Sequence, residues 1–472
     1  MELYLIPLVF ALVAAISPKN MVKYIGLAGA VATLIATVVK AMAFQTGSTV
    51  LVYDPELVTS FGLTFKMGYD GMGLFMVLLT NVIVPIILLS NLNRKVANER
   101  GFNAMVLLMQ VALIGVFTAL DGILFYVFWE LTLVPIFLIA LWYGATDSKK
   151  SLVKFFIYTF VGSLAMLLSL MALGTQAADF SHESLVAVQL TAKSACWIMG
   201  GFFLAFAIKI PLFPFHTWQP ATYTNAPMAG TMLLSGLMLK MALFGMIRWM
   251  IPLAPEALYE MQFLVITLGL IGIVYAAIIA IKQNDIKRIF AFASISHVGL
   301  IAAGLYSLTI EGFQGAVLQM LSHGLVIVGL FFVSEIIFNR WNTYTISEMG
   351  GIRSQATKFA SFFMILVLAS VAMPTTFNFV GEFTILYSLY NVNIGFAIVA
   401  GTTIILGAFY MLRMYQQTML GETNTKVFAD VTIVEGLVLL VIVGLVFFFG
   451  LYPKPIIELI TPSLQNILNQ IN

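Results

Sequence analysis

Long apolar stretches separated by short polar connections follow one another from one end of the chain to the other. An apolar helix of about 20 residues is long enough to cross the hydrocarbon core of a bilayer. With a window of roughly 19 residues, apolar stretches begin near Leu3, Val22, Asp70, Met105, Gly122, Leu152, Cys196, Met228, Phe263, Ile286, Phe313, Phe359, Gly395 and Ile433. The pattern predicts an all-α polytopic membrane protein with about 14 transmembrane helices.

Composition supports a membrane protein and excludes several other classes. Of the 472 residues, 61% are hydrophobic and only 9% are charged, whereas a soluble protein carries about 25% charged residues. The net charge of +2 provides no basic field for binding nucleic acid. The only cysteine, Cys196, cannot form an intrachain disulfide, and the four histidines are too scattered for a metal site.

Lysine and arginine residues concentrate in every second connection between the predicted spans. The odd-numbered connections hold most of them, whereas the even-numbered connections and the C-terminal segment hold only Lys66, Lys193 and Lys454. Positive residues in short loops stay on the cytoplasmic side of a membrane. With an even number of spans, both termini are therefore expected on the outer side.

Two predicted spans are interrupted by proline at membrane depth, the seventh at Pro211–Pro214 and the twelfth at Pro374–Asn378. Irregular backbone at this depth is tolerated where it lines a cavity, and broken helices at matching positions mark transport sites. The two breaks lie five spans apart, which is an odd number, so a repeat of spans 4–8 in spans 9–13 must be inverted in the membrane. The sequence therefore predicts two inverted five-helix repeats. The expected organisation is 1–104 for spans 1–3, 105–251 for spans 4–8, 252–420 for spans 9–13, and 421–472 for span 14 and a short tail. The alternative, that these prolines only kink their helices, stays open.

Ionisable residues far from the span ends are the strongest candidates for function. A charge at the bilayer centre costs from about 2.5 to more than 10 kcal/mol, so such a group faces the bundle interior and pairs or carries ions. Six residues meet this description: Glu130, Lys209, Lys240, His297, His323 and Glu382. We expect a proton relay. The alternatives are a structural ion pair of Glu130 and Lys209, a similar structural role for Lys240 and Glu382, and hydrogen-bonded core histidines. Asp70, Asp121, Asp285 and Glu311 lie at span ends and are interpreted as solvated caps.

The first two of these residues suggest a switch. At a separation of about 4 Å and an effective dielectric constant near 20, a glutamate and a lysine attract by roughly 4 kcal/mol. This is comparable with about 2.3 kcal/mol for moving one charge across 100 mV. Contact with Glu130 would hold the proton of Lys209, and separation would release it toward Lys240.

Five ordered segments resemble the antiporter-like subunits of respiratory complex I over nearly the whole chain. They are residues 125–136 around Glu130, 207–220 around Lys209, 226–240, 284–297, and 322–324. A glutamate at position 382, within residues 374–382, is similar to the M-type chain, the mitochondrial subunit-4 type, whereas other members usually carry lysine. One departure is Tyr223, which replaces the second histidine of its loop and leaves His216 as the nearby titratable group.

The resemblance implies a proton-translocating membrane subunit of NADH:quinone oxidoreductase. The six residues would form its relay, with no metal or cofactor bound by this chain. NADH, FMN, iron–sulfur clusters and the quinone, ubiquinone or menaquinone, are expected on partner subunits. The expected partners are neighbouring antiporter-like subunits, the lipid bilayer and protons, with no nucleic acid, in a bacterial inner (plasma) membrane rather than a mitochondrial or plastid one. The alternatives are a subunit of a multisubunit sodium/proton antiporter and a structural subunit whose charges only hold helices together.

Overall fold

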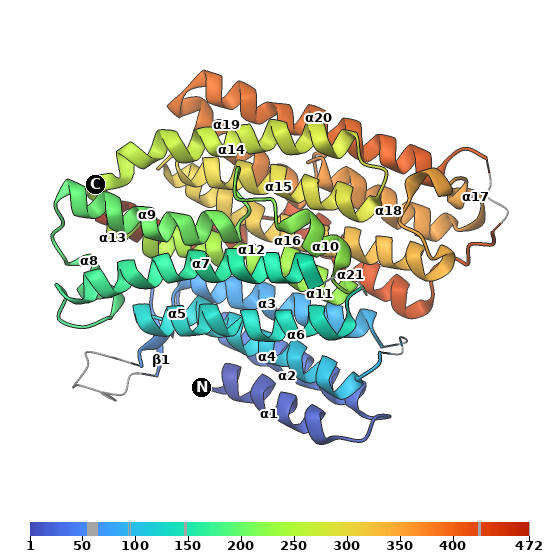
Figure 1. Ribbon diagram of the computed structural model, residues 1–472, viewed down its shortest axis with the longest axis horizontal. Helices are drawn as coiled ribbons and strands as arrows, with labels where there is room; N and C mark the ends of the chain where they lie inside the picture. The colour runs from blue at the N-terminus through green and yellow to red at the C-terminus, as the bar shows by residue number, and fades with distance from the viewer. Residues whose placement is uncertain (54–64, 93, 95, 146–148, 423–425, 472) are drawn as a thin grey trace. The chain divides into compact units, whose positions relative to one another are not determined.

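The computed structural model describes residues 1–53, 65–92, 94, 96–145, 149–422 and 426–471, and these are almost entirely helical (Figure 1). The chain divides into two compact units. Unit 1 consists of Met1–Ile210, Asn225–Phe263 and Glu458–Asn472, and unit 2 consists of Pro211–Thr224 and Leu264–Ile457.

Unit 1 is built from packed helices. α1 packs against α2 and α4, and α7 lies beside α9 (Figure 1). The helices are α1 (Glu2–Ile16), α2 (Val22–Met42), α3 (Gly71–Ser90), α4 (Glu99–Thr118), α5 (Gly122–Leu131), α6 (Leu133–Tyr143), α7 (Lys149–Gly174), α8 (His182–Val186), α9 (Ala192–Lys209), α11 (Met228–Leu233), α12 (Leu239–Gly245) and α13 (Ile251–Leu253). Two π-helical turns, η2 (Leu234–Met238) and η3 (Met246–Met250), interrupt the α11–α13 span, and a 3-10 turn η4 (Pro255–Ala257) precedes α14 (Leu258–Ile281).

A short hairpin between α2 and α3 was not predicted. β1 (Val50–Tyr53) pairs antiparallel with β2 (Met67–Tyr69), with an irregularity in register between Leu51 and Tyr53. Such short strands carry too few residues for a period-2 pattern to stand out beside the long apolar spans.

Unit 2 is organised around α16, which packs against α15 and α19. Its elements, besides most of α14, are α10 (Gln219–Asn225), α15 (Ile286–Leu305), α16 (Ile310–Trp341), η5 (Ile346–Glu348), α17 (Ile352–Gln355), α18 (Thr357–Ser370), α19 (Phe377–Val392), α20 (Ile394–Met419) and α21 (Ile433–Leu451).

The apolar pattern agrees with the structure. Twelve helices or uninterrupted helical runs are long and apolar enough to cross a membrane among the described residues, and α1 and α18 are shorter apolar helices. The apolar segments of the α11–α13 run and of α16 are buried inside the protein, whereas most residues in the apolar segments of α2, α20 and α21 are not. Such exposed apolar faces fit lipid or partner helices. The total of fourteen spans stays a prediction.

Both predicted helix breaks are confirmed. α9 ends at Lys209 and the next helix, α10, begins at Gln219, while α18 and α19 are separated by residues 371–376. Ala372 and Thr375 in the second break have positive φ angles of 54° and 80°, which a helix cannot accommodate.

The C-terminal segment, expected to be only a short tail, contains an amphipathic helix, α22 (Lys454–Ile471). Its buried side chains include Ile460, Leu464, Ile467 and Leu468, which recur at helical spacing. A window tuned to continuous apolar spans does not detect this pattern. Gly71 at the start of α3 permits the contact, because a Cβ there would lie 1.9 Å from the Leu459 carbonyl oxygen.

Candidate proton-relay site

Lys209 is a buried cation at the broken end of α9. Its side chain is 2% exposed, and the Nζ has no hydrogen-bond partner among the described residues. It lies 5.2 Å from the ring centroid of Trp129, a distance at which the aromatic face attracts a cation. Trp129 is held in turn by Phe125 and Phe206, with ring centroids 5.8 and 5.4 Å away.

Glu130 follows Trp129 on α5 and is less buried than Lys209. Ser163 of α7 lies against its carboxylate, and Lys209 is near enough to act on it electrostatically. The described residues show no ion pair of 4.0 Å or less between Glu130 and Lys209. The structure therefore holds these two groups as neighbours out of direct contact, with the cation against the indole ring.

Lys240 lies in the buried part of the α11–α13 run and is itself 0% exposed. Its Nζ donates a hydrogen bond of 2.5 Å to the Ser235 carbonyl oxygen. In the preceding π-turn, the Leu239 N–H reaches back five residues to Leu234. The Ser235 carbonyl thereby loses its usual α-helical donor and becomes available to the ammonium group.

In unit 2 the structure brings His297, His323 and Glu382 together. His297 Nδ1 lies 3.0 Å from Glu382 Oε1, and the ring centroids of the two histidines are 5.7 Å apart. These residues come from α15, α16 and α19 and are exposed by 5%, 2% and 1%, respectively. Three of the six candidates thus form one buried cluster.

Gln319 completes this cluster and was missed by the sequence analysis. Its Nε2 donates to Glu382 Oε1 at 2.9 Å, and Ser322 Oγ donates to its Oε1 at 3.0 Å. Gln319 stands one helical turn before His323, so a search for polar rather than only ionisable groups on that face would have found it. Gly381 permits the close approach of α19 to α16, because a Cβ there would lie 2.8 Å from the Gln319 backbone nitrogen.

His216 and Tyr223 lie in the irregular segment after α9 and in α10. The His216 ring stacks on Phe213 and meets Tyr275 edge-on, with centroids 5.7 and 5.0 Å away. Tyr223 is buried and packs against Trp218 and Phe331. Both residues are embedded among aromatic rings.

The interpretation of span-end carboxylates as solvated caps is confirmed only in part. Asp70, Asp121 and Asp285 each cap a helix with a side-chain oxygen, but Asp70 and Asp121 are buried. Asp70 Oδ1 also pairs with Arg248 Nη2 at 2.6 Å. The Asp70 carboxylate can be buried because the positive charge of Arg248 compensates for the loss of hydrating water.

Electrostatics around this ion pair act on its neighbours. Burial raises the pKa of Asp70, but Arg248 and the Gly73 N–H act in the opposite direction and together hold it below its ordinary value. Burial and the Arg248 charge lower the pKa of His182 to about 4. Its Nε2 lies 2.8 Å from the Arg248 carbonyl oxygen. His182 is therefore neutral at physiological pH.

Two other buried charges escaped the sequence analysis because they lie toward span ends. Lys287 is 2% exposed, donates to the Thr224 carbonyl at 3.1 Å and lies 5.2 Å from the ring centroid of Tyr344. Glu335 in α16 is 1% exposed. Over the part of the chain that the structure describes, no group of three or more His, Cys, Asp or Glu residues could hold a metal ion.

The family model and two of the most similar relatives point to one family of membrane proteins. Residues 119–407 match the family model described as NADH:quinone oxidoreductase/Mrp antiporter, TM. NADH-quinone oxidoreductase subunit M of Rickettsia prowazekii is 35% identical over 454 residues, covering 94% of this chain and 92% of that protein. NADH-ubiquinone oxidoreductase chain 4 of Metridium senile is 35% identical, covering 90% and 89%.

Solved structures agree with these relatives. A chain of respiratory complex I from Thermus thermophilus superposes with a TM-score of 0.93 at 29% identity, covering 100% of this chain and 99% of that chain. A chain of the Mrp complex from a Dietzia species has a TM-score of 0.89 at 18% identity, covering 99% and 97%. The second likeness concerns the fold alone.

Proposed function

Because the chain belongs to the NADH:quinone oxidoreductase/Mrp antiporter family of membrane proteins, we propose that it is the M-type proton-translocating membrane subunit of an NADH:quinone oxidoreductase. The observation that carries this proposal is its agreement with subunit M proteins along nearly their whole length. A sodium/proton antiporter subunit is the weaker alternative, because the Mrp chain shares only 18% of residues with this one.

We assign proton transfer to the six buried ionisable residues. Glu130 and Lys209 act as the coupling pair, Lys240 as the central carrier, His297 and His323 as bridging groups, and Glu382 as the terminal group. The contacts that support this assignment are those of Lys240 with the Ser235 carbonyl and of His297 with Glu382. Each provides a buried charge with a partner, which a group within a membrane requires.

Besides Glu130, Lys209 has a second neighbour that stabilises its charge, the Trp129 ring. When Glu130 moves away, the Trp129 ring still offers about 0.5–2 kcal/mol of attraction to the Lys209 ammonium. That is less than the roughly 4 kcal/mol of a direct ion pair at about 4 Å. Proton release from Lys209 is thus easier in the arrangement seen here than in a closed Glu130–Lys209 pair.

The chain itself contributes no redox centre in this proposal. NADH, FMN, iron–sulfur clusters and quinone belong to partner subunits, and the energy of quinone reduction reaches this chain through its neighbours in the membrane. We also propose that both termini lie on the periplasmic side of a bacterial plasma membrane and that residues 105–251 and 252–420 are inverted repeats.

The first test is purification of the tagged chain from its native membrane in mild detergent, followed by a native gel stained for NADH dehydrogenase activity. Migration in a large NADH-oxidising band that contains flavin and iron is expected. Migration in a smaller, redox-silent assembly would favour the antiporter, and sodium-dependent proton exchange would then be measured.

The relay is tested in the assembled complex with Glu130→Gln, Lys209→Ala and Glu382→Gln. Each variant is expected to assemble while lowering proton uptake and coupled quinone reduction. Lys193→Ala, at an exposed lysine, is the control. Full pumping by assembled Lys209→Ala would refute the relay, and failure of all three variants to assemble would favour a structural role for these charges.

A further inference from the structure

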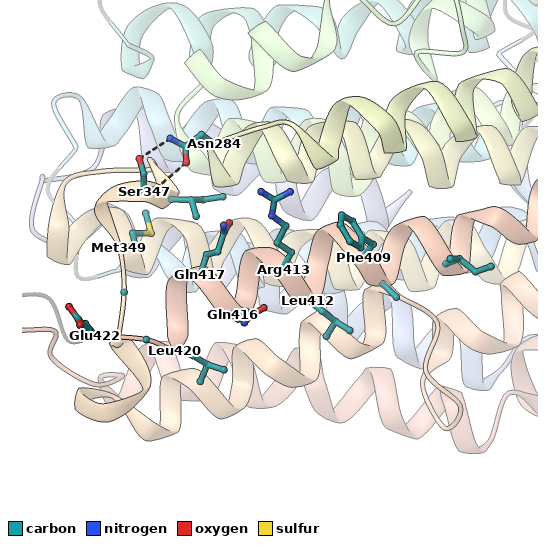
Figure 2. Close-up of a pocket in the computed structure, with 15 residues that line it drawn as sticks. Asn284, Ser347, Met349, Phe409, Leu412, Arg413, Gln416, Gln417, Leu420 and Glu422 are labelled. Carbon is teal, nitrogen blue, oxygen red and sulfur yellow. Dashed lines mark hydrogen bonds between the residues drawn. The ribbon is translucent and has the colours of Figure 1, made fainter.

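An open groove of about 1200 Å³ runs along one side of α20 in unit 2 (Figure 2). It lies outside the buried cluster around Glu382. Its walls are α20, the segment around η5, and Asn284 before α15. Ile405, Phe409 and Leu412 form its apolar part and are exposed by 72%, 54% and 41%.

Arg413 is the cation in this groove. It lies within the apolar helix α20, and its guanidinium makes no hydrogen bond or ion pair with any of the described residues. Figure 2 shows Arg413 and Gln417, one helical turn apart, extending from the same side of α20. A guanidinium has five N–H donors and is costly at a membrane unless it is paired. Any partner of this guanidinium therefore comes from outside the chain.

The polar edge of the groove is fixed in place. Asn284 Nδ2 donates to Ser347 Oγ at 2.8 Å, and the Ser347 N–H donates to Asn284 Oδ1 at 3.1 Å. One acidic side chain, Glu422, also lines the groove, but Figure 2 shows it beyond Leu420, with Gln417 between it and Arg413. An anion beside Arg413 would thus meet amides and a hydroxyl.

We propose that this groove binds an anionic phospholipid of the cytoplasmic leaflet, with the lipid phosphate on Arg413 and an acyl chain along Phe409 and Ile405. Arginine pairs with phosphate through two parallel hydrogen bonds, and the groove passes from polar to apolar along α20 as a lipid does from headgroup to chain. The leaflet follows from the orientation proposed above, in which the connection after α20 is cytoplasmic. An apolar partner helix would leave the guanidinium unpaired.

The test uses the whole purified complex, delipidated and then supplied with photoactivatable phosphatidylglycerol, followed by mapping of the labelled peptides. Labelling of α20 is expected, and Arg413→Gln should lower it about tenfold, as one lost charge-assisted contact predicts. Arg413→Lys should retain part of it, because it keeps the charge but not the paired geometry. Lys358→Gln, at an exposed cation of the same unit, should change nothing.

Equal labelling of α20 in the wild type and in assembled Arg413→Gln would overturn the proposal. A second measurement introduces a photo-crosslinking amino acid at Phe409 in the membrane-embedded complex. A lipid adduct is expected there. A crosslink to another subunit would instead show that a protein covers the groove and would also overturn the proposal. The leaflet assignment rests on the proposed orientation, but the native-gel test does not involve this groove, so failure of the lipid proposal is distinguishable from failure of the proposed function.

Discussion

Replacement of Gln319 by leucine tests whether the buried cluster around Glu382 transfers protons. Gln319 donates a hydrogen bond of 2.9 Å to the same carboxylate oxygen that faces His297. A hydrogen bond to a charged group contributes about 1.5–3 kcal/mol. A loss of this size corresponds to a factor of roughly 10 to 150 in an equilibrium constant.

The energy of this hydrogen bond is comparable with the energy needed to move one proton against the membrane potential. Moving one charge against 100 mV takes about 2.3 kcal/mol, so a loss of about 1.5–3 kcal/mol at this carboxylate is comparable with the energy of one charge-transfer step. The Gln319→Leu complex is therefore expected to assemble and to bind NADH normally, while its proton pumping falls about tenfold or more.

The assay is NADH-driven acidification of proteoliposomes, measured with a pH-sensitive dye beside the rate of quinone reduction. Gln283→Leu is the matched control, because that glutamine makes only a local contact with the Ile279 carbonyl. If Gln319→Leu does not assemble, Gln319→Met offers a flexible chain of similar length. Wild-type pumping in either assembled variant would refute the role of this hydrogen bond.

Three further predictions follow from single contacts. Trp129→Leu removes about 0.5–2 kcal/mol of attraction for the Lys209 ammonium and should lower proton pumping several-fold. Trp142→Leu, at an exposed indole, should leave pumping unchanged. Equal pumping rates in the two variants would contradict a role for the aromatic contact. The folded-state pKa of His182, about 4, lies below its ordinary value of 6.5. The contribution of this histidine to the free energy of unfolding, roughly 3 kcal/mol, is therefore complete above pH 6.5 and is lost as the pH falls toward 4. The melting temperature of the purified complex should thus fall between pH 7 and pH 5 in the wild type and less in His182→Gln, and parallel curves would exclude this histidine as the cause. Gly381→Ala puts a Cβ 2.8 Å from the Gln319 backbone nitrogen and should reduce the yield of assembled complex, while Gly401→Ala, where nothing lies within 4 Å, should leave the yield unchanged on a native gel.

The membrane class, the helical segments and both helix breaks were predictable because each depends on local physics. Hydrocarbon thickness sets the length of a span, and Pro211 and Pro374 mark where backbone hydrogen bonding fails. The candidate ionisable residues were also evident, since the cost of burying Lys240 or Glu382 follows from position along a span alone.

The sequence could not predict which side chains from other helices contact each buried polar or charged residue. Gln319 is uncharged, so a search limited to ionisable residues passed over it, and its contact with Glu382 exists only where α16 and α19 meet. Arg248 lay at a span end, and only packing showed that it neutralises Asp70. The amphipathic α22 has one apolar and one polar face, so a search for uniformly apolar windows passed over it.

The π-turn before Lys240 also sets the rotational phase of the rest of its helix. One extra residue in a turn rotates everything that follows by about 100° relative to a regular α-helix. The second π-turn, η3, contains Arg248 and advances the phase again. No single helical wheel describes this span, so the residues that share a face with Lys240 are those counted with the two insertions included. Deleting one residue within Leu234–Met238 would turn the ammonium away from its face while leaving the helix continuous.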